Sequence, residues 1–217
     1  MVRCPLSNHY IVKVCGMRDA ENIREVEATG IDWMGFIFWE RSSRYVSEPP
    51  AYLPTTVRRV GVFVDAPFAT IRQKIEEFSL DIIQLHGHES PAFCRDLRNA
   101  LRDSHSIAII KAFPIASHED IDATKAFEEA VDYFLFDTRT PLPGGSGHQF
   151  DWSLLDAYTG RTPFLLSGGI APNDAVRLHT FHHPRLLGID LNSRFETAPA
   201  IKSIPLLTSF LKALETL

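Results

Sequence analysis

Short runs of apolar residues recur along the chain, and most are followed by a longer stretch in which apolar residues return every three or four positions. The short runs contain few polar positions, which is typical of strands that are buried on both faces of a parallel sheet. We predict eight strands, at residues 10–15, 33–38, 58–64, 81–86, 106–113, 133–137, 163–167 and 186–191. Helical patterns lie at residues 19–29, 67–78, 90–101, 118–130, 151–158, 173–180 and 201–216.

Local signals refine the helices. Asp19 stands where a helix should begin, and Asn173 follows Pro172 at another start, so both residues are predicted helix caps. Asp151 is a third predicted cap. The segment between the second and third strands is polar and rich in proline, so we expect any helix there to be short or irregular.

This alternation of strands and helices predicts an α/β fold. A (β/α)₈ TIM barrel formed by a single domain over residues 1–217, with residues 1–9 as an N-terminal extension, fits eight strands and about as many helical segments. An open doubly wound sheet is the alternative, and the number of strands favours the closed barrel. In such a barrel the carboxyl ends of all strands meet at one face, where active sites are built.

Composition narrows the function classes. The chain has 217 residues, 45% of them hydrophobic and 23% charged, and a net charge of −5 without a block of like charges, so we expect no nucleic-acid partner. The N-terminus lacks the apolar core of a signal peptide, and the apolar run at 33–39 is too short to span a membrane. The cysteines, Cys4, Cys15 and Cys94, form no CxxC pair, which indicates reduced thiols in a cytoplasmic protein.

Two candidate catalytic residues stand at predicted strand ends. Cys15 closes the first strand, and Asp137 closes the wholly apolar run of the sixth. A buried cysteine is most often an inert core residue, whereas a carboxylate at this point can cap a helix, close a loop or act as an acid. The long loop after Asp137 weakens the helix-cap interpretation. Its glycines, Gly144, Gly145 and Gly147, would allow it to close over a ligand.

Small polar residues follow the last two strands and suggest an anion site. Ser167, Gly168 and Gly169 come after the seventh strand, and Asn192 and Ser193 come after the eighth. Phosphate sites of TIM barrels are often built from these two loops. Gly-Gly could also be a simple strand-to-helix turn, but the second loop favours phosphate binding. No GxGxxG or Walker motif indicates a nucleotide.

Seven segments in matching order resemble the phosphoribosylanthranilate isomerase family, over residues from about 10 to the C-terminus. They are "KVCGMRD" at 13–19, "GFIFWERSSRYVS" at 35–47, "GVFVD" at 61–65, "IIQLHG" at 82–87, "FDTRTPLPGGSGHQFDW" at 136–152, "LSGGIAPNDA" at 166–175 and "GIDLNSRFE" at 188–196. The resemblance implies an enzyme of tryptophan biosynthesis that catalyses the Amadori rearrangement of N-(5′-phosphoribosyl)anthranilate to 1-(o-carboxyphenylamino)-1-deoxyribulose 5-phosphate.

The resemblance also implies the roles of individual residues. The general base and general acid of the family fall on Cys15 and Asp137, and the arginine that meets the anthranilate carboxylate falls on Arg44. The chemistry suits these types, because ring opening needs a donated proton and a thiolate can remove the acidified C2′ proton. We expect the site to favour the thiolate, with Lys13 or backbone dipoles as candidate causes. Arg41 is the competing arginine in the same loop.

Further substrate contacts follow from the same match. Gly168, Gly169, Asn192 and Ser193 would hold the phosphate, and Asp190 matches an aspartate beside this loop to which we assign no role. His86 is expected to line the pocket.

We expect no metal and no cofactor. His86 and His88 form an HxH pair, but nothing else at ligand spacing accompanies them, and His88 is better read as part of a helix start. The expected partner is a small phosphosugar substrate, with no nucleic acid and no membrane, and the chain is a monomer or a homodimer. Cys94 is expected to be a core residue on a helix face.

Two positions depart from the family pattern. Ser42-Ser43-Arg44 stands where Ser-Pro-Arg is common, and Arg194 occupies a position that is usually glycine. We expect Arg194 to fold over the phosphate rather than to extend toward water and Glu196.

Two alternative functions fit the sequence less well. A different phosphosugar barrel, such as an epimerase or a synthase, would ordinarily lack Cys15 and Asp137 in these contexts, and a non-catalytic phosphometabolite-binding domain would need neither residue.

Overall fold

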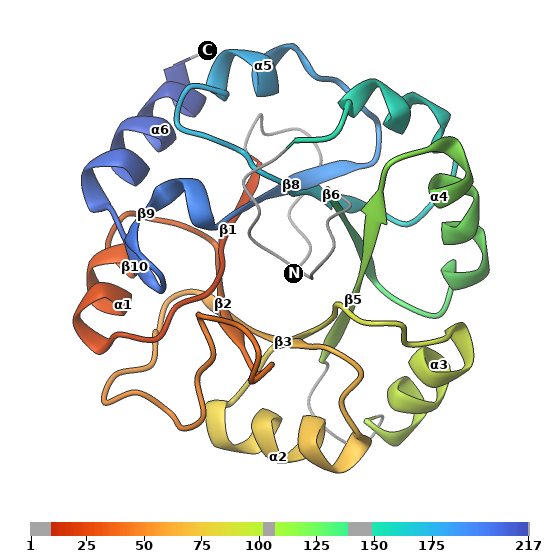
Figure 1. Ribbon diagram of the computed structural model, residues 1–217, viewed down its shortest axis with the longest axis horizontal. Coiled ribbons are helices and arrows are strands. Elements are labelled where there is room, and N and C mark those ends of the chain that lie inside the picture. The colour runs from red at the N-terminus through yellow and green to blue at the C-terminus, as the bar shows by residue number, and fades with distance from the viewer. Residues whose placement is uncertain (1–9, 102–106, 139–148, 217) are drawn as a thin grey trace.

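A computed structural model describes residues 10–101, 107–138 and 149–216. The predictions for residues 1–9, for Cys4 and for the glycine-rich loop at 144–147 therefore lie outside the described residues. Eight parallel strands form a closed barrel in the order β1 to β8, so the closed barrel is confirmed and the open sheet is excluded (Figure 1). The strands are β1 Ile11–Val14, β2 Trp33–Ile37, β3 Arg58–Phe63, β4 Ile82–Leu85, β5 Ala108–Ile115, β6 Tyr133–Thr138, β7 Phe164–Leu166 and β8 Leu186–Leu191.

Helices surround the barrel (Figure 1). They are the α-helices α1 Ala20–Glu27, α2 Phe68–Phe78, α3 Pro91–Ala100, α4 His118–Ala123, α5 Ala175–Thr180 and α6 Ile204–Thr216, and the 3₁₀ helices η1 Thr124–Phe127, η2 Trp152–Ala157 and η3 Ser193–Phe195. No helix among these described segments is long and apolar enough to cross a membrane.

Two of the three predicted helix caps are confirmed. Asp19 caps α1 by accepting a hydrogen bond from the Asn22 backbone N–H at 2.9 Å, and Asp151 caps η2 in the same way through the Ser153 backbone N–H. The third prediction was wrong by one residue, because α5 starts after Asp174 rather than after Asn173.

Several predicted helical regions differ from the observed structure. The β2–β3 connection, all of it described, forms turns and no helix, because Pro49, Pro50 and Pro54 interrupt the backbone hydrogen bonding that a helix needs. The segment at 151–158 is the short 3₁₀ helix η2 and not an α-helix. The C-terminal region begins with a hairpin of β9 (Glu196–Ala198) and β10 (Ile201–Lys202), so α6 begins three residues later than predicted, at Ile204.

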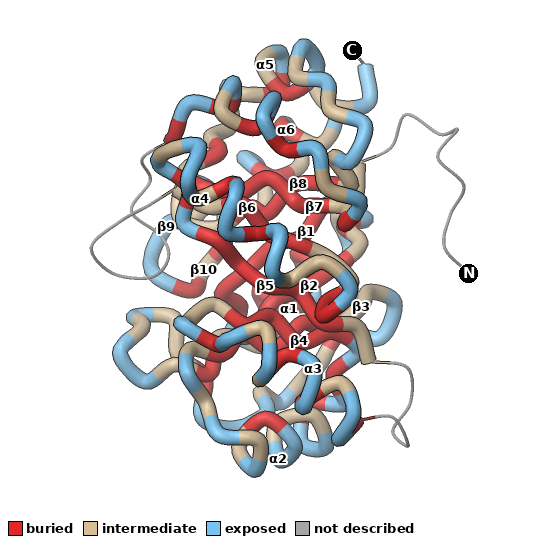
Figure 2. The backbone as a smooth tube through the Cα atoms, turned by 90° about the vertical axis from the view of Figure 1, so that its right-hand side faces the viewer, coloured by how far each residue is buried: buried red, intermediate tan, exposed pale blue. Residues whose placement is uncertain are grey.

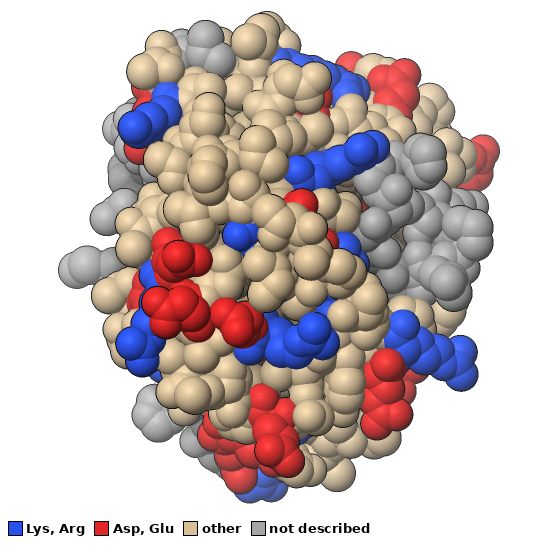
Figure 3. Space-filling model, turned by 60° about the vertical axis from the view of Figure 1, so that its left-hand side comes forward, with Lys and Arg blue, Asp and Glu red and all other residues tan. Residues whose placement is uncertain are grey.

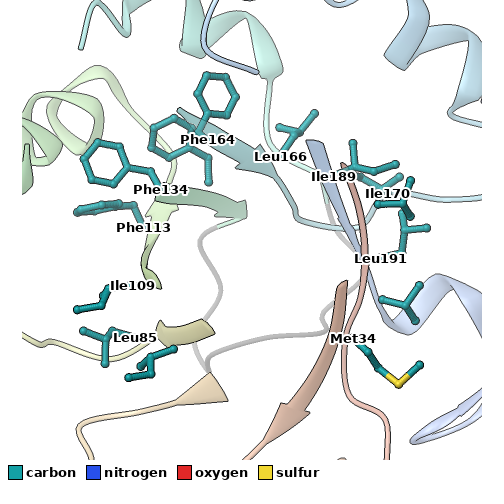
Figure 4. Packing of buried hydrophobic residues seen from close by; sticks show 14 of the residues in the cluster. Met34, Leu85, Ile109, Phe113, Phe134, Phe164, Leu166, Ile170, Ile189 and Leu191 are labelled. Atoms are coloured by element: carbon teal, nitrogen blue, oxygen red, sulfur yellow. The ribbon is translucent and has the colours of Figure 1, made fainter. Parts of the chain in front are cut away.

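The apolar core has two parts. The larger lies between the barrel and its helices, where aromatic residues such as Phe113, Phe134 and Phe164 pack along β5, β6 and β7 (Figure 4). The smaller part comes from inward-facing residues of the strands: Trp33, Val60, Ile82, Ile110, Ala112, Leu135 and Leu165. Burial is concentrated in the strands (Figure 2). Because apolar side chains fill much of the interior, a ligand site must lie nearer the mouth of the barrel.

The charged surface is mixed. Figure 3 shows the side of the molecule that lies at the left in Figure 1. On this side, acidic and basic side chains lie beside one another and do not form a region of one charge. This distribution agrees with the absence of a basic block in the sequence.

Candidate active site

Strand β1 delivers a buried thiol to the mouth of the barrel. Cys15 follows the last residue of β1 and continues its register, because its backbone N–H donates to the Leu191 carbonyl at 2.9 Å. The side chain is 4% exposed and lines a cavity. Room for it comes from Gly35 on β2, where a Cβ atom would lie 2.7 Å from the Cys15 sulfur. The pleat places Lys13, two residues earlier, on the same inner side of the barrel.

A buried ion pair lies beside this thiol. Lys13 Nζ is 2.8 Å from Asp190 Oδ1, and the two side chains are 0% and 7% exposed. Burial raises the pKa of the Cys15 thiol, and the Lys13 cation opposes that rise. For Lys13 itself, burial lowers the pKa, but the Asp190 carboxylate and Cys15 together outweigh that effect, so the pKa of Lys13 is raised and the residue remains a cation. Lys13 therefore acts in the expected direction, but the expectation that the site favours the thiolate is wrong for the protein without substrate, because burial has the larger effect on the pKa of Cys15.

Strands β4 and β6 bring a carboxylate and an imidazole together. Asp137 Oδ2 lies 3.3 Å from His86 Nε2, while Asp137 Oδ1 accepts the Thr138 backbone N–H at 2.8 Å. The other ring nitrogen, His86 Nδ1, lies 3.1 Å from Gln84 Nε2. Gln84 is 1% exposed, and its Oε1 atom has no hydrogen-bond partner among the described residues. Sequence reasoning missed Gln84, although it stands two positions before His86 and therefore faces the same interior.

The two loops predicted to hold phosphate lie beside each other at the same cavity. Gly168 and Gly169 adopt φ values of 87° and 68°, in the left-handed region that favours glycine. Asn192 and Ser193 line the cavity from the loop after β8. Backbone N–H groups of a turn in this conformation form concave anion sites. Arg194 is exposed and is not among the residues that line the cavity, so its contact with phosphate stays a prediction.

Arg44 reaches the cavity from the loop after β2 and is held there by a carboxylate. Its Nε and Nη2 atoms donate to the two oxygens of Glu196 at 2.8 and 2.6 Å. Glu196 also accepts from Lys202 Nζ at 2.5 Å. The competing Arg41 is exposed and does not line the cavity. Sequence reasoning associated Glu196 with Arg194 and did not find Lys202.

The structure brings the predicted site residues to one cavity at the mouth of the barrel. The predicted residues that line it are Cys15, Arg44, His86, Asp137, Gly168, Gly169, Asp190, Asn192 and Ser193. Ile37, Trp39, Val62, Val64 and Gln84 are lining residues that were not predicted. This cavity therefore combines a thiol, a carboxylate, a guanidinium and a glycine turn.

Two other predicted residues lie elsewhere. His88 is 95% exposed at its side chain and lies 3.2 Å from Asp65, so it does not face His86, and the start of α3 is capped by Ser90. Cys94 is fully buried on α3, as predicted, and burial raises its pKa to about 11.

Comparison with known proteins gives a consistent result. Residues 12–213 match the sequence model of the family described as N-(5′-phosphoribosyl)anthranilate (PRA) isomerase. The chain is 50% identical over 208 residues to the N-(5′-phosphoribosyl)anthranilate isomerase of Parabacteroides distasonis, with 93% of this chain and 92% of that protein covered. It is 49% identical over 205 residues to the protein of the same name from Phocaeicola vulgatus, with 94% and 98% covered.

A solved structure is similar in three dimensions. It is a phosphoribosylanthranilate isomerase in complex with reduced 1-(o-carboxyphenylamino)-1-deoxyribulose 5-phosphate. The TM-score is 0.79 at 28% identity, with 96% of this chain and 100% of that chain covered.

Proposed function

The chain belongs to the N-(5′-phosphoribosyl)anthranilate isomerase family of tryptophan biosynthesis, and on that premise we propose that it rearranges N-(5′-phosphoribosyl)anthranilate with Cys15 as general base and Asp137 as general acid. The observation that carries the proposal is that both residues, from β1 and β6, line a single cavity together with Arg44 and the Gly168–Gly169 turn. A thiol and a carboxylic acid at one site match the two proton transfers that the reaction needs.

Asp137 acts first in this mechanism. Its carboxyl group protonates the furanose ring oxygen as the bond from that oxygen to C1′ breaks. The nitrogen lone pair forms the C1′=N bond of a protonated Schiff base, and Asp137 is left as a carboxylate. His86, 3.3 Å from Asp137, orients this group and lines the site.

Cys15 acts second. Its thiolate removes the proton from C2′, and the electrons move to give an enolamine with a C1′=C2′ bond and a neutral nitrogen. The positive Schiff base beside the sulfur offsets the burial that raises the pKa of Cys15, since a nearby cation favours the thiolate. In the last step C1′ gains a proton and the C2′ hydroxyl loses one, which regenerates both groups and yields the ketone.

The ends of the substrate are bound by groups that do not react. The phosphate lies on the Gly168–Gly169 turn with Asn192 and Ser193, and the anthranilate carboxylate faces Arg44. Asp190 holds Lys13 beside the thiol and serves the base indirectly.

The test is turnover of freshly prepared substrate, followed by the loss of anthranilate fluorescence. Cys15→Ser and Asp137→Asn should each lower kcat by at least ~10²-fold with the fold retained, because each change removes one proton-transferring group. Asp156→Asn, at an exposed position of η2, is the matched control and should keep full activity. Parent-like turnover in Cys15→Ser or Asp137→Asn would remove that residue from its role.

A further inference from the structure

The proposed mechanism does not use the buried cation Lys202. Lys202 lies on β10 and is 2% exposed, and its ammonium group donates to Glu196 at 2.5 Å and to Asn192 Oδ1 at 2.9 Å. Glu196 is the same carboxylate that accepts both hydrogen bonds from Arg44. The hairpin of β9 and β10, which lies beside α1 (Figure 1), thus brings an acidic and a basic residue next to Arg44, which lines the cavity.

The backbone of Lys202 is fixed as firmly as its side chain. Its N–H donates to Asn22 Oδ1 at 2.7 Å, and its carbonyl accepts from Asn22 Nδ2 at 2.9 Å. Asn22 belongs to α1 and is itself 5% exposed. Burying an unpaired lysine costs folding free energy. Because β10 and α1 together hold Lys202 in place, we infer that its charge has a function at this site.

The charges of this cluster explain what the lysine does. Arg44 and Glu196 alone form a neutral pair, with side chains 12% and 6% exposed. If the carboxylate of a ligand also bound this guanidinium, two negative charges would lie close together with one positive charge between them, and like charges at close range repel. With Lys202 included, the cluster carries one net positive charge. The guanidinium has further N–H groups beyond the two bonded to Glu196, so it can also donate hydrogen bonds to that second carboxylate.

We propose that Lys202 is a specificity-determining residue: its buried charge balances Glu196, so that Arg44 meets the carboxylate on the substrate's aromatic ring with one net positive charge. This inference rests on the proposed role of Arg44. The Arg44–Glu196 ion pair would otherwise conflict with that role, because Glu196 would cancel the charge of Arg44. With Lys202 present, Glu196 orients Arg44 and the cluster keeps its positive charge.

The experiment compares two stable ligands that differ only in the carboxylate. One is reduced 1-(o-carboxyphenylamino)-1-deoxyribulose 5-phosphate, and the other carries a plain phenyl ring. Calorimetry gives Kd for both, and their ratio measures preference for the carboxylate. Lys202→Met should lower this preference on the order of tenfold while Kd for the phenyl ligand holds. Adding Glu196→Gln to Lys202→Met restores one net positive charge and should return the preference to nearly the parent value.

Further variants make the test decisive. Glu196→Gln alone raises the net charge and should increase the preference, because glutamine still accepts from Arg44. Lys212→Met, at an exposed position of α6, is the matched control and should leave both Kd values unchanged. If Lys202→Met fails to fold, Glu196→Gln and the double variant still test the charge argument.

Contrary outcomes separate this inference from the proposed function. Equal weakening of both ligands by Lys202→Met would assign the lysine to the phosphate loop through Asn192, or to the fold, and would overturn the inference. So would a double variant that stays as impaired as the single one, or an unchanged preference in Glu196→Gln. Arg44→Ala reports on the premise: if it leaves the preference unchanged, the assignment of Arg44 in the proposed function fails instead.

Discussion

Lys13 and Asp190 are paired twice, once as neighbouring positions in the register of β1 and β8 and once through their side chains, whose Nζ and Oδ1 atoms lie 2.8 Å apart. Both side chains are buried, so the pair has little access to water. It joins the first and last strands of the barrel and fixes a cation two residues before the proposed base.

This arrangement predicts the pH dependence of the base. Burial raises the pKa of Cys15 against the effect of Lys13, and a general base works only when it is deprotonated. The rising limb of kcat/KM should therefore lie on the alkaline side of an ordinary thiol, whose pKa is about 8.5. The measurements are the pH profile of kcat/KM and the ultraviolet absorbance of the thiolate, with Cys4→Ala and Cys94→Ala so that Cys15 is the one thiol left of the three in the sequence. A limb on the acidic side of that value would contradict the assignment.

The ion pair itself can be tested by unfolding in urea. Lys13→Met leaves Asp190 buried and uncompensated, which should reduce the free energy of unfolding by about 3–5 kcal/mol. Asp190→Asn combined with Lys13→Met removes both charges and should recover much of that loss. A double variant as unstable as the single one would mean that the lost stability comes from packing and not from the unpaired carboxylate.

Glu27 gives a separate prediction for stability in acid. Burial alone would raise its pKa, but hydrogen bonds from Tyr52, Thr55 and Thr56 hold it at about 2, against 4.5 for an ordinary glutamate. Since the folded-state pKa is the lower one, its contribution is complete above pH 4.5 and is lost as pH falls toward 2. The difference in thermal midpoint between parent and Glu27→Gln should shrink over that range.

The control for this prediction is Glu21→Gln, which changes an exposed glutamate in the first turn of the same helix. The difference in thermal midpoint between Glu21→Gln and the parent should stay constant over the same acidic range. A Glu27→Gln difference that stays constant with pH would show that the carboxylate has no depressed pKa in the folded protein.

Much of the fold could be predicted because buried parallel strands leave a strong signal. Each of the eight predicted strands overlaps an observed one, since long apolar runs such as "YFLFD" allow few alternatives. The β9–β10 hairpin left no such signal. Its strands are three and two residues long, and Ala200, at φ 68°, makes a turn for which the sequence shows no glycine.

The site, like the fold, could be predicted only in part from the sequence. Cys15, Asp137 and the two small-residue loops were found because position after a strand determines which face a residue reaches, whereas Arg44, His86 and Asp190 were found through the family resemblance. Glu196 and Lys202 were not placed there, because Glu196 contacts Arg44 across more than a hundred and fifty residues and Lys202 joins the cluster through Glu196. Gly35 was missed for a related reason: its role is to leave space for Cys15 on a neighbouring strand, and no local pattern encodes such a contact.

Arg194 replaces the glycine that is usual in the family, beside the loops that we propose bind the phosphate. It belongs to η3 and is exposed, while Glu196, its expected alternative partner, is bonded to Arg44 and Lys202. An exposed cation near a bound dianion lowers the free energy of binding, and salt screens that effect over about 8 Å at physiological ionic strength. Arg194→Ala should therefore raise KM several-fold at low salt, less at high salt, with kcat unchanged because the phosphate lies far from the reacting carbons. Arg194→Gly should behave alike, since it also removes the cation. Steady-state kinetics at two salt concentrations measure this, and parent-like KM in both variants at low salt would make the side chain a bystander.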